Sequence, residues 1–403
     1  MKVLQILPEL NSGGVERGTL EVADFLVKQG HEALVVSNGG RLVVKLEESG
    51  ARHIAMPVHR KSLGSLFQVR PFRKLLEREK PDILHIRSRV PGWIAYLAWR
   101  KMDKATRPRL VSTVHGFYSV NRYSAVMTKG ERVIAVSESI RDYILKNFKD
   151  VPEEKITVIH RGVDPAHCPR GYTPDAAWLD AWRSEQPQLD GKTVLLLPGR
   201  ITRWKGQADF LRLVAGLKAE GIQVHGLIAG ETHTRKKAFL KELQGMVTAL
   251  GLSDEITFLG HRLDVREVMA VSDLVLSLSL DPEAFGRVTL EAMALGKPVV
   301  AYNHGGVAEQ LLRIYPTGLV PVGDFNAAAE KCEHILEGGD YPEKIGSFTL
   351  EAMLHSTLAV YESLINTLPS AFFSCSTDSA KIHTSSDVPA ERPVAKANQA
   401  NSD

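Results

Sequence analysis

The sequence predicts an α/β protein built from two doubly wound domains, each a parallel sheet covered by helices. Short apolar runs alternate with helical stretches along most of the 403 residues, which is typical of βα units. The alternation lapses once, between Asp164 and Gly191, as expected for an interdomain connection. The length leaves room for two domains, each with its own hydrophobic core. In such sheets the ligand-binding loops follow the carboxyl ends of the strands, so we expect a cleft between the two domains.

The first domain is predicted to span residues 1–165. A helical stretch, Val15–Gln29, follows the first apolar run and carries its own apolar positions. Continuous apolar runs of this length indicate strands that are buried on both faces. The expected strands are Val3–Leu7, Ala33–Ser37, His53–Met56, Ile83–Ile86, Leu110–Val114, Val133–Val136 and Ile156–Ile159.

A linker at residues 166–191, rich in proline and containing a short helix, leads to a second domain at residues 192–347. The periodicity of Phe348–Leu364 predicts a last helix over residues 348–367. Residues 368–403 are polar and aperiodic, and we expect a disordered tail. The expected strands of the second domain are Thr193–Pro198, Val224–Ala229, Ile256–Leu259, Leu274–Leu280, Pro298–Tyr302 and Gly318–Val322.

Composition excludes several classes of protein. A formal charge of +3 gives no basis for nucleic-acid binding. The cysteines Cys168, Cys332 and Cys375 are too widely spaced for a disulfide framework or a zinc site. The first apolar run is too short for a signal peptide, and no apolar stretch reaches the roughly 18 residues of a membrane span. We therefore expect a cytoplasmic protein.

The most informative stretch runs from Asp281 to Gly306. An apolar strand leads into a loop broken by proline, and the loop opens a helix near Gly286. The first turn of a helix offers unpaired amides and a positive potential, which favour an anionic ligand. Glu283 precedes this helix, and Glu291 lies about one turn inside it. Phosphate-binding amides beside two carboxylates that can accept hydroxyl groups indicate a nucleotide sugar.

These two glutamates resemble the E-x7-E element of retaining GT-B glycosyltransferases. The continuation to Gly305-Gly306-Val307-Ala308-Glu309 is similar to glycosyltransferase family 4. The resemblance covers residues 1–367. It implies a GT-B fold whose last helix crosses back to the first domain, and transfer of a sugar with retention at the anomeric carbon. It also implies that Glu283 contacts the transferred sugar, that Glu291 contacts the ribose, and that the donor is bound by Phe285, Gly286 and Arg287.

A charged turn, Gly199–Gly206, follows the first strand of the second domain. Its Arg200 and Lys205 can both reach one diphosphate, the arginine as a fork and the lysine as a point charge. The turn also resembles the G-R-x4-K-G motif of the family. We therefore predict that Arg200 and Lys205 neutralise the leaving nucleotide.

Two loops of the first domain are expected to face this ligand. The glycine-rich turn at Gly13 and Gly14 follows the first strand and opens a helix, which is typical of a phosphate or sugar cradle. His115 stands at the carboxyl end of another strand. By resemblance to the family we assign it hydrogen bonding and charge stabilisation rather than general base catalysis.

One position departs from the family. Asparagine commonly precedes Gly-Val-Asp there, but this chain has Arg161. We interpret His160–Asp164 as a structural turn, and a nucleotide contact at this point stays open. No D-x-D motif for a divalent metal occurs in the sequence, so we expect neither a metal nor a cofactor.

A basic stretch, residues 59–76, interleaves cationic side chains with Leu and Phe. We expect peripheral contact with an anionic membrane at the cytoplasmic face, although a solvated helix face also explains the pattern. Arg87, Arg89 and Trp93 would add basic and aromatic character to the acceptor side. A glycan, lipid-linked or phosphorylated acceptor fits these features.

We predict a retaining glycosyltransferase that uses a nucleotide sugar, with UDP as the expected nucleotide, in the synthesis of an envelope polysaccharide or lipopolysaccharide core. Two alternatives stay open. One is a GT-B nucleotide-sugar epimerase, and the other is a GT-B binding module without catalysis.

Overall fold

A computed structural model of the chain describes residues 1–11, 13–231 and 237–366. Residues 1–366 form one compact unit. The predicted tail at 368–403, with Cys375, lies outside the described residues. No helix in the described part of the chain is long and apolar enough to cross a membrane.

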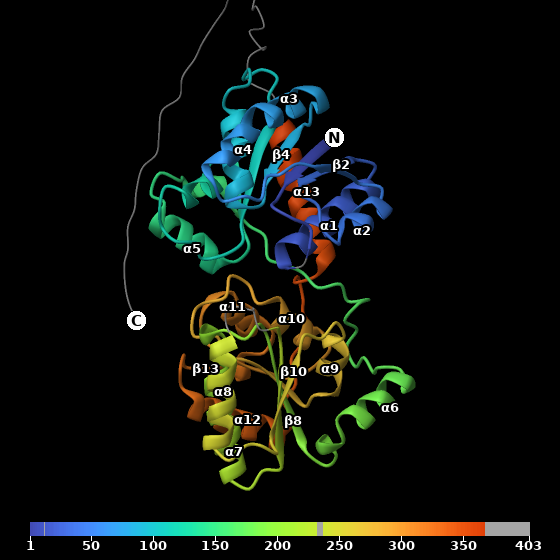
Figure 1. Cartoon of the computed structure of the whole chain (residues 1–403), viewed down its shortest axis with the longest axis vertical. Helices are drawn as coiled ribbons and strands as arrows, with labels where there is room; N and C mark the ends of the chain where they lie inside the picture. Colours follow the sequence, from blue (N-terminus) through green and yellow to red (C-terminus); the bar gives the residue numbers. More distant parts are fainter. Residues whose placement is uncertain (12, 232–236, 367–403) are drawn as a thin grey trace, which may run out of the picture. The chain divides into compact units, whose positions relative to one another are not determined.

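The first sheet has seven parallel strands in the order β3-β2-β1-β4-β5-β6-β7 (Figure 1). Both faces are covered. Within β1, Leu4 and Ile6 are buried in one core cluster, and Val3 is buried in the cluster on the other face. This explains why the strands are continuous apolar runs. The strands are β1 (Lys2–Ile6), β2 (Glu32–Ser37), β3 (Arg52–Ala55), β4 (Ile83–Ile86), β5 (Arg109–Val114), β6 (Arg132–Ala135) and β7 (Ile156–Val158).

Helices and short turns connect these strands. They are α1 (Gly14–Lys28), α2 (Val43–Glu48), α3 (Val69–Glu79), α4 (Arg89–Trp99) and α5 (Glu138–Asn147), with 3₁₀ turns η1 (Leu63–Gln68), η2 (Ser124–Thr128) and η3 (Glu153–Lys155). The segment that follows holds α6 (Ala176–Glu185), where Trp178 and Trp182 stack at 5.2 Å between ring centroids, and the turn η4 (Pro187–Leu189).

The second sheet has six parallel strands in the order β10-β9-β8-β11-β12-β13. Its strands are β8 (Thr193–Pro198), β9 (Val224–Ala229), β10 (Ile256–Gly260), β11 (Leu274–Ser277), β12 (Val299–Tyr302) and β13 (Leu319–Val320). Its helices are α7 (Gln207–Ala219), α8 (Lys237–Ala249), α9 (Val265–Val271), α10 (Arg287–Ala294), α11 (Gly305–Ile314) and α12 (Phe325–Gly338), with turns η5 (Arg203–Lys205) and η7 (Pro316–Gly318).

The last helix, α13 (Leu350–Asn366), packs on the first sheet beside α1, as the resemblance implied (Figure 1). Tyr361 is fully buried there, and its hydroxyl lies 2.7 Å from Nδ1 of His85 in β4. The residues that lead into α13 lie beside the segment that follows β7. The amide of Val163 donates to the carbonyl of Phe348, and that of Leu350 donates to Val163. The two connections between the sheets therefore run side by side.

The unit has two halves, one built on each sheet. A carboxylate on a helix of the second half also joins them. Glu309 in α11 accepts hydrogen bonds from the amides of Glu138 (2.8 Å) and Ser139 (2.6 Å) at the start of α5, and from Nε2 of His160 (3.2 Å). Burial opposes its ionisation, but these donors lower the pKa of Glu309 below its ordinary value. The negative charge at the N-terminus of α5 is stabilised by the helix dipole.

Both sheets reverse their strand order next to their first strand, at β1/β4 and at β8/β11. Crevices at such switch points are the usual ligand sites of doubly wound sheets. The loops after β1, β8 and β11 carry the predicted site residues, so topology places them at switch points. The expected strand Leu274–Leu280 ends early, at Ser277, because the amide of Leu280 bonds to the carbonyl of Trp204 in η5 instead of to the sheet.

Candidate active site

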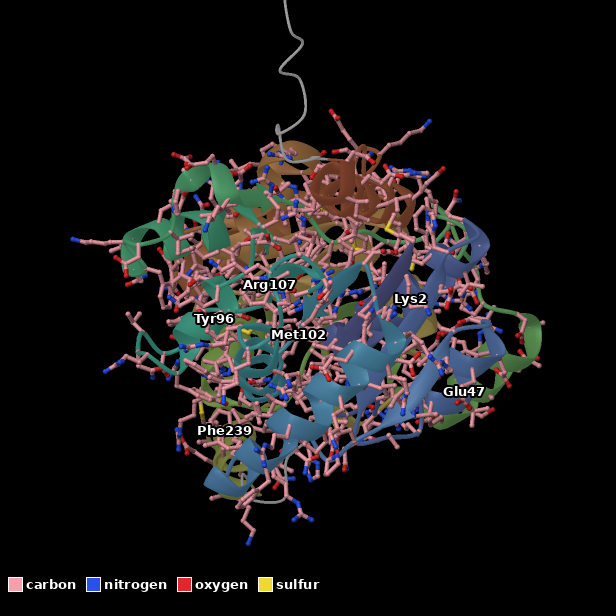
Figure 2. The ribbon with its side chains drawn as sticks, turned by 90° about the horizontal axis from the view of Figure 1, so that it is seen from above. Lys2, Glu47, Tyr96, Met102, Arg107 and Phe239 are labelled. Atoms are coloured by element: carbon pink, nitrogen blue, oxygen red, sulfur yellow. The ribbon has the colours of Figure 1, made fainter. Side chains whose placement is uncertain are left out.

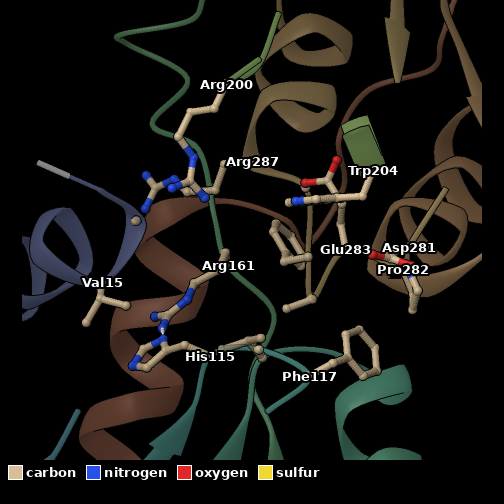
Figure 3. Close-up of a pocket in the computed structure, with 16 residues that line it drawn as sticks. Val15, His115, Phe117, Arg161, Arg200, Trp204, Asp281, Pro282, Glu283 and Arg287 are labelled. Carbon is tan, nitrogen blue, oxygen red and sulfur yellow. Dashed lines mark hydrogen bonds between the residues drawn. The ribbon is translucent and has the colours of Figure 1, made fainter. Parts of the chain in front are cut away.

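A cavity of about 730 Å³ is lined by residues from both halves of the unit (Figure 3). In this view Arg161, Arg200 and Arg287 lie on one side with Val15, and Glu283, Asp281 and Trp204 lie on the other. The lining residues are Gly14, Val15, His115, Gly116, Phe117, Val136, Arg161, Arg200, Trp204 and Asp281 to Arg287. Of the ten predicted site residues, seven line it; Gly13, Lys205 and Glu291 do not.

Gly286 is the residue before α10 and has a left-handed backbone, with φ of 85°. A Cβ at this position would lie 2.4 Å from Cγ2 of Val307. Glycine is therefore required both by the turn and by its packing against α11, not only by close approach of a ligand. The result is that the first amides of α10 border the cavity beside Phe285 and Arg287.

Glu283 and Lys205 form an ion pair, with 2.7 Å between Oε1 and Nζ. The same carboxylate oxygen accepts a 2.7 Å hydrogen bond from the hydroxyl of Ser279. The ammonium group also lies 4.6 Å from the ring centroid of Trp204, within cation–π range. Lys205 thus reaches the wall of the cavity through its partner, and its ammonium group is paired with Glu283 in this structure.

The arginines of the cavity differ in their partners. Arg287 bonds to Glu21 of α1, with 2.8 Å between Nη2 and Oε1. Arg200 is exposed, and none of the ion pairs in the described part of the chain involves its guanidinium. Arg200 is therefore available to a ligand without losing a carboxylate.

Glu291 lies one turn along α10 and faces a smaller cavity of about 140 Å³. It accepts a 2.9 Å hydrogen bond from Arg17 of α1, and Arg17 also pairs with Glu21. Together with the Arg287–Glu21 pair, this makes a row of alternating charges that links α1 to α10. The smaller cavity is otherwise walled by Leu263, Val265, Met269, Leu295, His167, Cys168 and Arg266.

The glycine-rich turn presents the N-terminus of α1 to the large cavity through Gly14. Gly13 precedes the helix with a φ of 135°, a region that L-residues rarely adopt. A Cβ there would also lie 2.6 Å from the carboxylate of Glu16. Gly13 is thus needed for the turn, whereas Gly14 is the residue that borders the cavity.

His115 lines the cavity, but its nitrogens do not face it freely. Nδ1 lies 2.5 Å from Nη2 of Arg161, and Nε2 is buried without a partner. Burial, then the charges of Arg161 and Arg87, hold the pKa of His115 well below its ordinary value. The imidazole is therefore neutral.

Arg161 was interpreted from the sequence as part of a structural turn, and that interpretation was incomplete. The turn is structural, because a Cβ at Gly162 would meet the backbone of Thr349. The side chain of Arg161, however, lines the cavity while being 8% exposed. Its departure from the asparagine of the family was the signal in the sequence.

The expectation for Arg87 was wrong. It was expected to add positive charge to the acceptor side, but it is 1% exposed and donates to Oε1 of Gln5 at 2.9 Å. Arg89 and Trp93 do lie near the surface, where Arg89 is 4.7 Å from the ring centroid of Tyr118 and Trp93 donates to the carbonyl of Tyr123.

A further cavity of about 660 Å³ lies in the first half, away from all the predicted site residues. Tyr96 and Trp99 of α4 form part of its wall, and the guanidinium of Arg107 covers the Trp99 ring at 3.6 Å from its centroid. Figure 2 labels Tyr96, Met102 and Arg107 in this region. Among the residues that the structure describes, no group of three or more His, Cys, Asp or Glu could hold a metal ion.

Comparison with known proteins places the chain in a family. Residues 12–167 match the model for Glycosyltransferase Family 4, and residues 180–351 match the model for Glycosyl transferases group 1. The two matches together include the strands from β2 to β13. Several curated relatives are glycosyltransferases, and the chain covers most of their length.

One relative is the N-acetyl-alpha-D-glucosaminyl L-malate synthase of Bacillus anthracis, which is 26% identical over 86% of this chain and 90% of the relative. Another is the capsular polysaccharide biosynthesis glycosyltransferase CapM of Staphylococcus aureus, 25% identical over the same shares. The lipopolysaccharide core biosynthesis mannosyltransferase LpcC of Rhizobium leguminosarum is 29% identical over 54% of this chain and 62% of the relative.

Solved structures agree. A glycosyltransferase from Rickettsia africae superposes with a TM-score of 0.80 at 28% identity, over 91% of this chain and 99% of that chain. Anabaena Alr3699/HepE in complex with UDP superposes with a TM-score of 0.75 at 24% identity, over 90% of this chain and all of that chain, and it shares the fold. The chain therefore belongs to the group 1 glycosyltransferases of family 4, with the GT-B fold of two Rossmann-like domains.

Proposed function

We propose that this glycosyltransferase moves a sugar from a nucleoside-diphosphate sugar to an acceptor hydroxyl with retention at the anomeric carbon. The observation that carries this proposal is the large cavity. It is bordered by the N-termini of α1 and α10, by the guanidinium groups of Arg161, Arg200 and Arg287, and by the carboxylate of Glu283. Helix N-termini and cations suit a diphosphate, and the carboxylate suits sugar hydroxyls.

The donor is proposed to span both cavities. Its diphosphate lies at the amides of α10, opposite Gly14, with Arg200 and Lys205 as charge partners. Glu283, once Lys205 leaves it, accepts hydrogen bonds from the transferred sugar. Glu291 accepts the ribose hydroxyls beside the smaller cavity, and Arg17 keeps the charge of this glutamate balanced.

Chemically, the cations stabilise the negative charge that develops on the leaving diphosphate, which is the largest effect such a site can supply. No residue at the cavity stands out as a covalent nucleophile. A same-face displacement fits this cavity, in which the leaving diphosphate takes the proton of the acceptor hydroxyl. Because Arg200 and Lys205 supply the charge, we propose that transfer needs no divalent metal, and EDTA should leave the rate unchanged.

Relatives guide the choice of donor and pathway. Anabaena Alr3699/HepE has been crystallised with UDP and with UDP-glucose, which supports a UDP-sugar. The relatives that act in capsular polysaccharide and lipopolysaccharide core synthesis support an acceptor among the glycans of the cell envelope.

The test is incubation of the pure protein with a panel of UDP-, GDP-, ADP- and TDP-sugars. Slow release of a nucleoside diphosphate from one donor supports a transferase, and the anomeric configuration of the glycoside made with a matching acceptor tests retention. Epimerisation of the donor would support the epimerase instead. No turnover of any donor, together with nucleotide binding, would support a binding module.

We also propose that the surface at η1 and α3 contacts anionic membrane at the cytoplasmic face. Phe67 is 82% exposed and Leu66 is 48% exposed, next to the exposed cations Arg60, Lys61 and Arg70. Each cation near an anionic surface contributes about 1 kcal/mol. The full chain should sediment with phosphatidylglycerol vesicles in low salt, and Phe67→Ser should weaken this. Equal binding to neutral vesicles, or no effect of the substitution, would refute the proposal.

A further inference from the structure

Arg161 is a buried cation that borders the large cavity and has no ion pair with any carboxylate in the described part of the chain. It is 8% exposed. Its hydrogen bonds among the described residues go to Nδ1 of His115 and, at 3.7 Å, to Sδ of Met353 in α13. Neither partner carries a negative charge. Burial, and then the nearby charges of Arg87 and Arg287, lower the pKa of Arg161 to about 9.

An unpaired guanidinium in such a place is costly to the fold, because its desolvation is not offset by an opposite charge. The surroundings add to this cost. The charge of Arg87 is nearby, and its Nε and Nη2 are buried without a hydrogen-bond partner among the described residues. Both guanidiniums approach Gly18 of α1, where a Cβ would lie 3.1 Å from Nη2 of Arg87 and 3.4 Å from Nη1 of Arg161. Glu21 is the carboxylate that raises the pKa of Arg161, but it is bonded to Arg287 and Arg17.

His115 is suited to hold this guanidinium. A guanidinium can only donate, so Nδ1 of His115 accepts with its lone pair, and the proton of the neutral ring is on Nε2. Nε2 is buried away from solvent. With one nitrogen occupied and the other protonated, the ring in this arrangement has no free basic nitrogen for a substrate.

We propose that Arg161, not His115, is the group of the first half that binds the ligand, and that it pairs with an anionic oxygen, phosphate or carboxylate, entering the cavity beside the N-terminus of α1. His115 is then a positioning residue. This rests on the proposed transferase function and adds a third ligand cation to Arg200 and Lys205. The anion belongs either to the donor diphosphate or to an acidic acceptor.

A stability measurement tests whether Arg161 serves the fold or a ligand. Arg161→Gln removes the charge but keeps an N–H donor for His115. If the charge serves a ligand, the Tm of the unliganded variant equals or exceeds that of the wild type. Arg161→Lys, which keeps the charge, should retain ligand binding in part.

Calorimetric titration then identifies the source of the anion, with Arg203→Gln as control. Arg203 is exposed and paired with Glu242 outside the cavity, so its substitution changes the net charge equally. If the anion is the donor diphosphate, Arg161→Gln weakens UDP binding by about tenfold or more. If it belongs to the acceptor, UDP binding is unchanged, and inorganic phosphate binds the UDP-loaded wild type but not the UDP-loaded variant.

Two results would overturn the proposal. One is a clear fall in the Tm of unliganded Arg161→Gln, which would assign the residue to the fold. The other is that UDP and phosphate bind this variant as they bind Arg203→Gln. Neither measurement needs turnover, so such a failure would leave the transferase proposal standing, and a protein without transferase activity could still show the Arg161 effect.

Discussion

The two sides of the large cavity differ in how their charges are compensated. On the second half, Lys205 is paired with Glu283 and Arg287 is paired with Glu21. On the first half, the hydrogen bonds that the guanidiniums of Arg161 and Arg87 make with described residues go to neutral groups. We therefore propose that Lys205 and Arg287 of the second half bind a ligand by exchanging partners. The buried Arg161 of the first half would leave no carboxylate on binding, and neither would the exposed Arg200 of the second half. The charges of Lys205 and Arg287 are balanced by their carboxylate partners when no ligand is bound. The charge of Arg161 is held in place before an anion binds, which is a form of preorganisation.

The largest effects should come from the second half. We expect Lys205→Ala and Glu291→Ala each to lower kcat/KM by about 100-fold or more, because each removes a contact to the donor. Steady-state rates of nucleoside diphosphate release measure this. The Tm should stay near the wild-type value, since each variant loses an ion pair that is partly exposed to solvent. If the variant that carries both substitutions were active, neither residue would belong to the active site.

A substitution at Glu309 tests the contact between the two halves of the unit rather than the active site. Glu309→Gln should lower the free energy of unfolding by about 2 kcal/mol, as expected for hydrogen bonds to a charged group, and chemical denaturation measures it. Because the folded-state pKa of Glu309 is lowered, its contribution is complete above its ordinary pKa of 4.5 and is lost as the pH falls through the folded value. The difference between variant and wild type should therefore shrink in acid. A difference that grows in acid would contradict this account.

The smallest effect should come from removing Glu21, the carboxylate of the first half that pairs with Arg287 of the second half. Glu21→Gln frees the charges of Arg287 and Arg17, so UDP affinity should rise by about threefold and become more sensitive to salt. Glu242→Gln is the matched control, because Glu242 pairs with Arg203 outside the cavity. Equal responses of the two variants would show that the Glu21 pairs do not compete with the ligand.

Local sequence pattern was enough to predict most of the fold. The apolar runs coincide with the strands to within a few residues, because parallel strands are buried on both faces and read as continuous runs. The exception, β11, ends at Ser277 because Leu280 bonds to the turn at Trp204, and no local pattern encodes that contact. The turns at Gly286 and Gly206 could also be predicted, because a glycine just before a helical stretch favours a turn there. Both residues do have left-handed backbones.

Pairing across the chain could not be predicted in the same way. Arg17 and Glu291 are 274 residues apart in sequence, and nothing near either one indicates the other. The contact between Arg161 and His115 was likewise hidden, so the sequence favoured the histidine as the acting group. Local motifs identify which residues gather at a site, but long-range packing decides which of them are already paired.

The most direct test is calorimetric titration of UDP into the wild type, Lys205→Ala and Glu283→Gln. If Lys205 leaves Glu283 to bind the diphosphate, Lys205→Ala weakens binding by about tenfold or more. Glu283→Gln then binds UDP as tightly as the wild type or more tightly, because UDP carries no sugar for Glu283 and the lysine no longer has a competing partner. Equal losses in both variants, or no loss in Lys205→Ala, would contradict the exchange of partners.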